Sequence, residues 1–193
     1  MSVIRAFIAI DLSAEIESRL DEVLQNYRTQ LTKIPIRWVV ASNIHLTLKF
    51  LGDVSVSNLN LLTELIQKEV YNHHQFDISV GSSGAFPNIR QPRVIWVGVE
   101  APAELNSIQN GIEVTTARLG YSREERAFSP HLTLGRVSRN ATSQDVKAIS
   151  KVMETTRVGF LGVTCVENVH LYRSDLQPNG AVYTKIFSSS LIK

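Results

Sequence analysis

The sequence predicts a fold of mixed strands and helices that is duplicated within the chain, with two lobes and a cleft between them. Strand-like and helix-like patterns alternate along the chain, the tetrapeptide His-Leu-Thr-Leu occurs twice, and no linker separates the two halves. The chain has 193 residues, of which 44% are hydrophobic and 20% charged. This is the composition of a globular protein that can bury its own core without a metal or a disulfide.

The first half of the sequence opens with a short apolar run, 5–11, that is rich in strand-forming residues. Ser13 is a suitable N-cap for the helix that follows. The apolar face of that helix consists of Ile16, Leu20, Val23, Leu24 and Tyr27. After the first His-Leu-Thr-Leu strand, a second helix is marked by Leu59, Leu62, Ile66 and Val70. Strands are expected at 76–80 and 93–100, and the Gly, Ser and Pro residues of 81–92 predict a turn and loop between them.

The second half repeats this order. Residues 96–105 align with residues 7–16 as a strand, an acid, a short break and Ala-Glu followed by an aliphatic residue. A third helix is marked by Leu105, Ile108, Ile112 and Leu119, with Gly120 just past its end. Thr142 and Asp145 can cap a fourth helix, whose apolar face holds Val146, Ile149 and Met153. Strands near 162–166, 169–173 and 181–188 close the chain, with turn chemistry at 174–180.

The two halves are interpreted as diverged copies of one unit. The motif histidines are 86 residues apart, and the aligned first strands are 89 apart, a difference that one small loop gap explains. Chance similarity between amphipathic elements is the alternative. A matching order together with a four-residue identity in register favours duplication, and residues 1–193 are expected to form a single two-lobed domain.

The His-Leu-Thr-Leu motif places two polar side chains on one face of a strand. Because side chains alternate along a strand, His45 shares a face with Thr47, and His131 shares one with Thr133. The leucines then lie on the opposite face, toward the core. A single motif of this kind is usually structural, but two copies on matching elements would bring both imidazoles and both hydroxyls together across the cleft.

Such a group of side chains suits phosphodiester chemistry. Histidine titrates near pH 6.5, so one imidazole can accept a proton from the attacking oxygen while the other protonates the leaving oxygen. The hydroxyls can stabilise the charge on the non-bridging oxygens. Metal chemistry is disfavoured, because neither motif has a carboxylate beside it and the sequence has neither an H-E-x-x-H motif nor a cysteine pair.

Several stretches together resemble the two-histidine (2H) phosphoesterase superfamily, and in particular its RNA 2′,3′-cyclic phosphodiesterase branch, also called 2′-5′ RNA ligase. They are "RAFIAIDL", "RWVVASNIHLTLKFLGDV", "GAFPNIRQPRVIWVGV", "FSPHLTLGRV" and "LYRSDLQPNGAVYTKIF". The resemblance implies an α+β, duplicated, two-lobed fold in which each lobe is an antiparallel sheet backed by two helices, with the active cleft between the lobes. It implies a hydrolase that opens an RNA or nucleoside 2′,3′-cyclic phosphate to a 2′-phosphomonoester, with reversible 2′-5′ ligation as a related reaction.

The resemblance also assigns roles to residues. His45 is the expected proton donor and His131 the expected proton acceptor. Thr47, Thr133 and Arg136 are expected to bind the substrate phosphate, and Phe7 corresponds to an aromatic position near the nucleobase. No metal or other cofactor is expected. The partner is an RNA with a 2′,3′-cyclic phosphate end or a cyclic nucleotide.

Other features carry weaker expectations. Side chains that can line a groove for RNA are Arg37, Trp38, Lys49, Arg123 and Arg126, although surface charge or partial core explains each one alone. The histidines assigned to structure are His73, His74 and His170. Cys165 is interpreted as a buried thiol. No signal peptide or membrane span is expected, and the protein is expected to be cytoplasmic. The sequence offers no oligomerisation signature, so a monomer is the default expectation.

Two alternative functions stay open at this stage. The first is another 2H substrate, such as an ADP-ribose cyclic phosphate or a 2′-5′ oligonucleotide. The second is a non-catalytic module that binds RNA ends through the same cleft. The net charge of +2 accommodates a polyanionic ligand, but it is far below that of a non-specific nucleic-acid coat.

Overall fold

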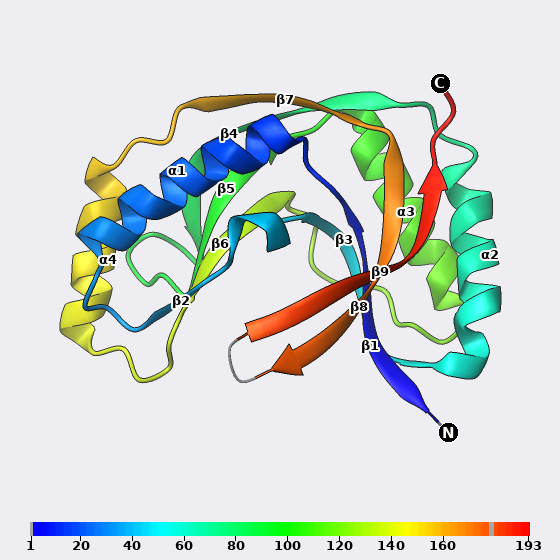
Figure 1. Ribbon diagram of the computed structural model, residues 1–193, viewed down its shortest axis with the longest axis horizontal. Helices are drawn as coiled ribbons and strands as arrows, with labels where there is room; N and C mark the ends of the chain where they lie inside the picture. Colours follow the sequence, from blue (N-terminus) through cyan, green and yellow to red (C-terminus); the bar gives the residue numbers. More distant parts are fainter. Residues whose placement is uncertain (1, 178–179) are drawn as a thin grey trace.

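The computed structural model describes residues 2–177 and 180–193, which form two antiparallel sheets (Figure 1). The four-stranded sheet has the order β3 (Leu46–Ser55), β1 (Val3–Ile10), β8 (Asn168–Gln177) and β9 (Gly180–Ser190). The five-stranded sheet has the order β2 (Ile36–Trp38), β6 (His131–Val137), β5 (Val94–Glu100), β4 (Phe76–Phe86) and β7 (Phe160–Val166). The turn expected at 174–180 is wrong for residues 174–177, which continue β8, and for Gly180, which begins β9, whereas residues 178 and 179 lie outside the described residues.

Each sheet is accompanied by two helices, as the resemblance implies. Helices α1 (Ala14–Gln30) and α4 (Ser143–Thr155) lie on the side of the five-stranded sheet, and α2 (Leu59–Val70) and α3 (Ala103–Ala117) lie beside the four-stranded sheet (Figure 1). Two short 3-10 helices, η1 (Ala41–Asn43) and η2 (Val56–Asn58), precede β3 and α2. Among the described residues, no helix combines the length and the apolar character needed to cross a membrane.

The two sequence halves exchange helices. Helix α1 follows β1 of the four-stranded sheet, yet it packs against β7 of the five-stranded sheet. Helix α3 follows β5 of the five-stranded sheet, yet it packs against α2 and β3. Each lobe is therefore assembled from elements of both halves, and neither half forms a lobe by itself.

The predicted helix starts are confirmed. The Ser13 hydroxyl accepts a hydrogen bond from the backbone N–H of Ile16 at 3.4 Å and caps α1. At α4, the Thr142 hydroxyl accepts from the N–H of Asp145, and the Asp145 carboxylate accepts in return from the N–H of Thr142. These caps satisfy N–H groups that a helix start leaves without an intrahelical partner.

Two further sequence predictions are wrong. Residues 81–86 are not part of a loop, because β4 runs through them to Phe86 and pairs with β5, with an irregularity at Ser82. Cys165 is exposed rather than buried. Its neighbours Thr164 and Val166 are buried, so the alternation of β7 places the thiol on the outer face. The Gly and Ser content of 81–86 and the apolar neighbours of Cys165 were therefore poor guides to the environments of these residues.

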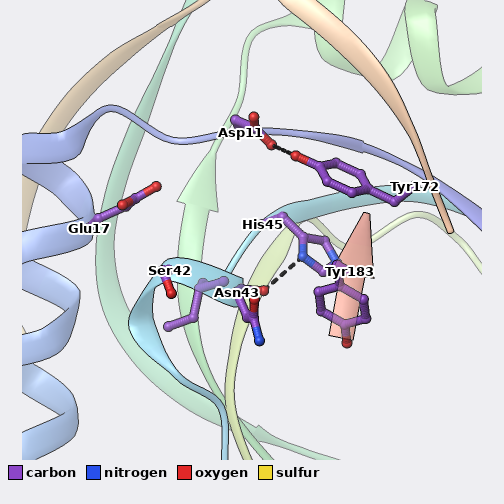
Figure 2. Close-up of a pocket in the computed structure, with 8 residues that line it drawn as sticks. Asp11, Glu17, Ser42, Asn43, His45, Tyr172 and Tyr183 are labelled. Carbon is purple, nitrogen blue, oxygen red and sulfur yellow. Dashed lines mark hydrogen bonds between the residues drawn. The ribbon is translucent and has the colours of Figure 1, made fainter. Parts of the chain in front are cut away.

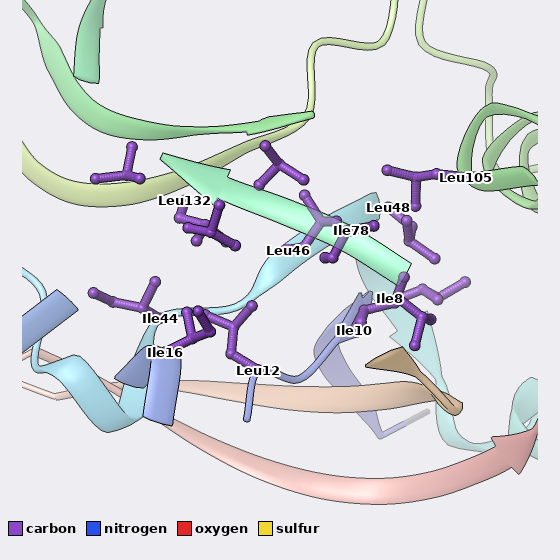
Figure 3. Packing of buried hydrophobic residues seen from close by; sticks show 14 of the residues in the cluster. Ile8, Ile10, Leu12, Ile16, Ile44, Leu46, Leu48, Ile78, Leu105 and Leu132 are labelled. Atoms are coloured by element: carbon purple, nitrogen blue, oxygen red, sulfur yellow. The ribbon is translucent and has the colours of Figure 1, made fainter. Parts of the chain in front are cut away.

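Leucines from both His-Leu-Thr-Leu copies lie in one hydrophobic core that joins the two lobes. Leu46 and Leu132 are fully buried, and Figure 3 shows them with Ile8 and Ile78 among the packed side chains. The motif strands β3 and β6 also approach each other, with Cα atoms within 8 Å. The apolar face of each motif therefore holds its strand against the common core, and the polar face is left for other contacts.

Candidate active site

The polar face of each motif is the more exposed face of its strand. His45, Thr47, His131 and Thr133 are all half-buried, whereas the leucines between them are buried. This confirms the expected division of the motif into an apolar and a polar face. The strands thus place an imidazole and a hydroxyl at the same relative position in each lobe.

Both motif imidazoles are held in the same way. His45 Nδ1 lies 2.9 Å from the carbonyl oxygen of Asn43, and His131 Nδ1 lies 2.7 Å from that of Ser129. Since a carbonyl oxygen can only accept, each Nδ1 carries the hydrogen and donates it. Each Nε2 is then left to accept a proton when the ring is neutral or to donate one when it is charged. In both copies the carbonyl belongs to the residue two positions before the histidine, so the internal repeat includes this hydrogen bond as well.

A bulge in β6 brings Arg136 onto the motif face. The pairing between β5 and β6 passes from Thr133 to Gly135 and skips Leu134. An extra residue of this kind reverses the alternation that follows it. Arg136, which strict alternation would place on the leucine face, is therefore exposed on the side of His131 and Thr133. Its positive charge is close enough to lower the pKa of His131, although burial of the imidazole is the larger cause.

The His45 imidazole lies in an aromatic setting. Phe7 stacks on it with 4.6 Å between ring centroids, and Tyr183 meets it edge-on at 5.2 Å. A hollow beside the ring is lined in part by Glu17 and Tyr172 (Figure 2). Burial lowers the pKa of His45, and the bond to the carbonyl of Asn43 offsets part of that effect.

Aromatic side chains also surround the His131 imidazole. Phe86 contacts it edge-on with 4.8 Å between centroids, and Trp96 lies at 6.5 Å. Trp96 is the residue that aligns with Phe7 in the sequence repeat, so the two copies place an aromatic ring beside each histidine. The Trp96 ring lies flat against Gly84, where a Cβ atom would come within 2.3 Å of it. A glycine is therefore required at that position of β4.

Asp11 anchors a polar network next to His45. Its carboxylate accepts a hydrogen bond from Tyr172 at 2.5 Å (Figure 2). It also accepts one from Lys185 at 2.6 Å, and His170 Nε2 lies 3.4 Å away. Burial acts to raise the pKa of Asp11, but the bonds from Lys185 and Tyr172 outweigh it and lower the pKa below its ordinary value. A negative charge is thereby kept near His45, whose pKa it acts to raise. His170 is 7% exposed and bonded to Ser188, in agreement with its assignment to structure.

The expectation for Phe7 is not supported. Its side chain is only 2% exposed and is enclosed by His45, Phe50, Tyr172 and Tyr183. Such burial argues against direct contact with a nucleobase. The position of Phe7 instead suits a supporting role, because the stacked ring limits how far the His45 imidazole can turn.

Two of the residues expected to line a groove for RNA lie elsewhere. Lys49 is 4% exposed and paired with Glu113 of α3, so its charge is satisfied in the interior. Trp38 packs on Tyr27 of α1, on the face of the five-stranded sheet opposite the motif. Both lie on core faces because the alternation of β2 and the bulge of β3 direct them inward.

The three arginines of the same group are exposed. Arg123 donates to the side chain of Asn110, and Arg126 has no side-chain partner among the described residues. Arg37 is directly opposite Arg136 in the pairing of β2 with β6, and neither has a carboxylate partner in the described part of the chain. Like charges at directly opposed positions are unfavourable unless an anion lies between them. Arg37 therefore stays a candidate for phosphate contact.

Sequence reasoning missed the aromatic and acidic surroundings of the histidines. Tyr172 and Tyr183 come from strands far along the chain, and Phe86 comes from a segment that was interpreted as a loop. The one signal available in the sequence was the repeat itself, which aligns Trp96 with Phe7. In the described ranges, no three His, Cys, Asp or Glu side chains gather as a metal-binding group.

A family model described as LigT like Phosphoesterase matches the chain twice, at residues 10–96 and 97–183. These two matches divide the chain where the internal repeat does. A relative from Methanothermobacter thermautotrophicus, described as RNA 2′,3′-cyclic phosphodiesterase, is 33% identical over 184 residues, which cover 94% of this chain and 95% of the relative. A relative of the same description from Escherichia coli is 32% identical over 140 residues, which cover 72% of this chain and 75% of the relative.

Solved structures show the same fold. Escherichia coli LigT complexed with 3′-AMP has a TM-score of 0.77 and 28% identity, and the match covers all of both chains. A protein from Thermus thermophilus has a TM-score of 0.81 and 26% identity, and the match covers 97% of this chain and 98% of that one. With a family model over nearly its whole length and relatives above 30% identity, this chain belongs to the LigT-like branch of the 2H phosphoesterases.

Proposed function

We propose that the protein is an RNA 2′,3′-cyclic phosphodiesterase that needs no metal ion. The observation that carries the proposal is the matched geometry of the two motif histidines, whose Nδ1 atoms donate to carbonyl oxygens at 2.9 and 2.7 Å and leave each Nε2 for proton transfer. The carboxylate of Asp11 acts on His45, and the guanidinium of Arg136 acts on His131. The relatives described as RNA 2′,3′-cyclic phosphodiesterases support the choice of substrate.

The two charges suit different roles for the two histidines. A nearby carboxylate favours the protonated form of His45, which is the form that donates a proton. A nearby guanidinium favours the neutral form of His131, which is the form that accepts one. Burial lowers the pKa of both histidines, and the two charges act on it in opposite directions, which supports the donor role for His45 and the acceptor role for His131.

The reaction is a displacement at phosphorus. A water molecule attacks the cyclic phosphate and loses a proton to Nε2 of His131. The bond between phosphorus and the 3′ oxygen breaks, and that oxygen takes the proton from Nε2 of His45. The product is a 2′-phosphomonoester with a free 3′ hydroxyl. The same displacement, with the 5′ hydroxyl of a second RNA in place of water, would break the same bond to the 3′ oxygen and form a 2′-5′ link.

Thr47, Thr133 and Arg136 bind the phosphate in this proposal. The two hydroxyls lie on the same face as the histidines and can donate to the non-bridging oxygens, where negative charge accumulates. The planar guanidinium of Arg136 can donate two parallel hydrogen bonds to a phosphate. Together they place the phosphorus between the two Nε2 atoms.

Hydrolysis of nucleoside 2′,3′-cyclic phosphates in the presence of a chelator tests the proposal. We expect full activity in excess EDTA and a product whose phosphate is on the 2′ oxygen, which phosphorus NMR of the product identifies. Loss of activity that added metal restores would contradict metal independence. A 3′-phosphate product would contradict the assigned leaving group, and binding without turnover would indicate an RNA-end-binding module.

The pH dependence of kcat/KM should reflect the lowered pKa values of both histidines. Activity rises with pH as His131 loses its proton and falls as His45 loses its own, which gives a bell-shaped profile. Since burial lowers both pKa values from 6.5, the maximum should lie below pH 6.5. Replacing Arg136 by Gln removes a cation that lowers the pKa of His131, so the acidic limb should move to higher pH. A maximum above pH 6.5, or an acidic limb that Arg136→Gln leaves in place, would contradict these assignments.

A further inference from the structure

Arg37 and Arg136 form a pair of exposed cations on the motif face of the five-stranded sheet. They are directly opposite each other in the pairing of β2 with β6. Their sequence neighbours Ile36, Trp38 and Gly135 lie on the other face, because a Cβ atom on Gly135 would come within 2.8 Å of Trp38 and 3.0 Å of Ile36. Since side chains alternate along a strand, both guanidiniums extend from the motif face.

Contacts within the protein do not explain this pair. Among the described residues, neither guanidinium forms an ion pair. Two like charges at directly opposed positions, with Cβ atoms about 5 Å apart, repel each other. Strand β2 is at the edge of its sheet, so no strand of the described chain lies beyond Arg37. Two unpaired cations at an open sheet edge are the arrangement expected where anionic groups bind.

The geometry of the reaction determines which RNA lies over these arginines. In a displacement at phosphorus, the attacking and leaving oxygens lie on opposite sides of the phosphorus atom. His131, which accepts the proton of the attacking oxygen, is on β6 of the five-stranded sheet, and β2 is the neighbouring strand. His45, which protonates the leaving 3′ oxygen, directly precedes β3 of the four-stranded sheet. The molecule that carries the attacking oxygen therefore lies over the five-stranded sheet, on the side of β2.

We propose that Arg37 binds the first phosphate of an acceptor RNA, the strand whose 5′ hydroxyl takes the place of water in 2′-5′ ligation. This inference rests on the proposed function. In such a strand, a single ribose separates the attacking 5′ oxygen from the next phosphate. Arg136 binds the reacting phosphate, and Arg37, on the next strand of the sheet, binds this second phosphate. Arg37 is thus a specificity residue for RNA over water as the attacking molecule.

Cleavage of a 2′-5′ link measures the same contact, because it is the reverse of ligation and passes through the same transition state. The 3′ hydroxyl of the first nucleoside attacks phosphorus and loses its proton to His45. The leaving 5′ oxygen takes a proton from His131, and the cyclic phosphate is formed again.

Two substrates isolate the contribution of the second phosphate. One is the 2′-5′-linked dinucleotide ApA, and the other is the same dinucleotide with a methyl phosphodiester on its last 3′ oxygen. In the wild-type protein kcat/KM should be higher for the second substrate, because only that substrate offers a phosphate to Arg37.

Replacing Arg37 by Gln should lower the ratio of kcat/KM between the two substrates about 5-fold or more, since a hydrogen bond to a charged group contributes at least that factor. Hydrolysis of adenosine 2′,3′-cyclic phosphate should keep its rate, because water carries no second phosphate. Arg157→Gln is the matched control. Arg157 is also exposed, but it follows α4 on the helix side of the sheet, where its neighbour Thr156 accepts a hydrogen bond from Gln30 of α1.

Calorimetry gives a second measurement that does not need turnover. The probes are the same two dinucleotides with a 3′-deoxy first nucleoside, which lacks the hydroxyl that attacks in cleavage. The wild-type protein should bind the probe with the additional phosphodiester more tightly. Arg37→Gln should weaken the binding of that probe alone, by about 5-fold or more.

Each outcome has a distinct meaning. An unchanged preference for the additional phosphate in Arg37→Gln would overturn the proposal. An equal loss on both dinucleotides and on the cyclic nucleotide would also overturn it, because Arg37 would then act on the reacting phosphate. If the wild-type protein turns over none of the substrates, the proposed function fails, and if it hydrolyses the cyclic nucleotide alone, only the ligation chemistry fails. In both cases the calorimetric comparison still decides the role of Arg37.

Discussion

Replacing either His45 or His131 by alanine is expected to lower kcat for a 2′,3′-cyclic nucleotide by about 100- to 10,000-fold, which is the usual contribution of one positioned proton-transfer group. Both imidazoles are half-buried on the polar face of their strands, so neither fills the core and the fold should survive. Steady-state rates, together with circular dichroism and urea unfolding of each variant, measure the effect.

The double variant separates a shared mechanism from two independent contributions. If His45 and His131 act on the same displacement, removing both should cost little more than removing one, because neither works without the other. His74→Ala provides the control, since His74 is exposed and its imidazole makes one hydrogen bond in the described part of the chain, with the carbonyl oxygen of Lys193. Near-normal turnover in either single variant would contradict the proposal that both histidines act as acid and base in the same reaction.

Glu113→Gln and Lys49→Met should each destabilise the protein by about 3–5 kcal/mol, which is typical when one partner of a buried ion pair is removed. The two side chains are 5% and 4% exposed. The Lys49 ammonium also donates to the carbonyl oxygen of Ser122 at 2.8 Å, and the Glu113 carboxylate accepts from the N–H of Glu124 at 3.2 Å. The pair thereby links β3 to α3 and to the segment that precedes β6.

A double variant tests whether the loss comes from an unpaired buried charge. Lys49→Met combined with Glu113→Leu removes both charges and should recover much of the stability that each single variant loses. Urea unfolding of the wild-type protein, Lys49→Met, Glu113→Leu and the double variant gives the free energies of unfolding and the coupling between the two sites. Arg19→Met is a suitable control, because its ion pair with Glu15 is exposed and contributes at most about 1 kcal/mol. A single variant at Lys49 or Glu113 that unfolds like this control would contradict the prediction.

Much of the fold could be predicted from short-range patterns. The caps at Ser13 and Thr142 depend on residues three positions away, and the buried faces of α1 and α2 depend on helical spacing. The repeat of His-Leu-Thr-Leu pointed to the two site strands and to the division of each motif into a core face and a polar face. These features are local, so the sequence around each residue is enough to indicate them.

Features that depend on partner strands could not be predicted in this way. A bulge arises only where two strands pair. The bulges at Leu48 and Leu134 place Phe50 and Arg136 on the faces of their strands that carry the motif histidines. The bulge at Leu48 also directs the side chain of Lys49 into the core, where it forms an ion pair with Glu113 from the other half of the sequence. A sequence pattern read by strict alternation assigns all three side chains to the wrong face.

The sequence by itself determined the repeated motif, the helix caps and the division of each motif strand into a polar and an apolar face. The tertiary structure alone decided which lobe each helix covers, which charge lies beside each histidine, and that Phe7 is buried under Tyr172 and Tyr183. The reason is physical: periodicity and capping act over a few residues of one segment, whereas register, burial and electrostatic surroundings depend on segments that meet only in the folded chain.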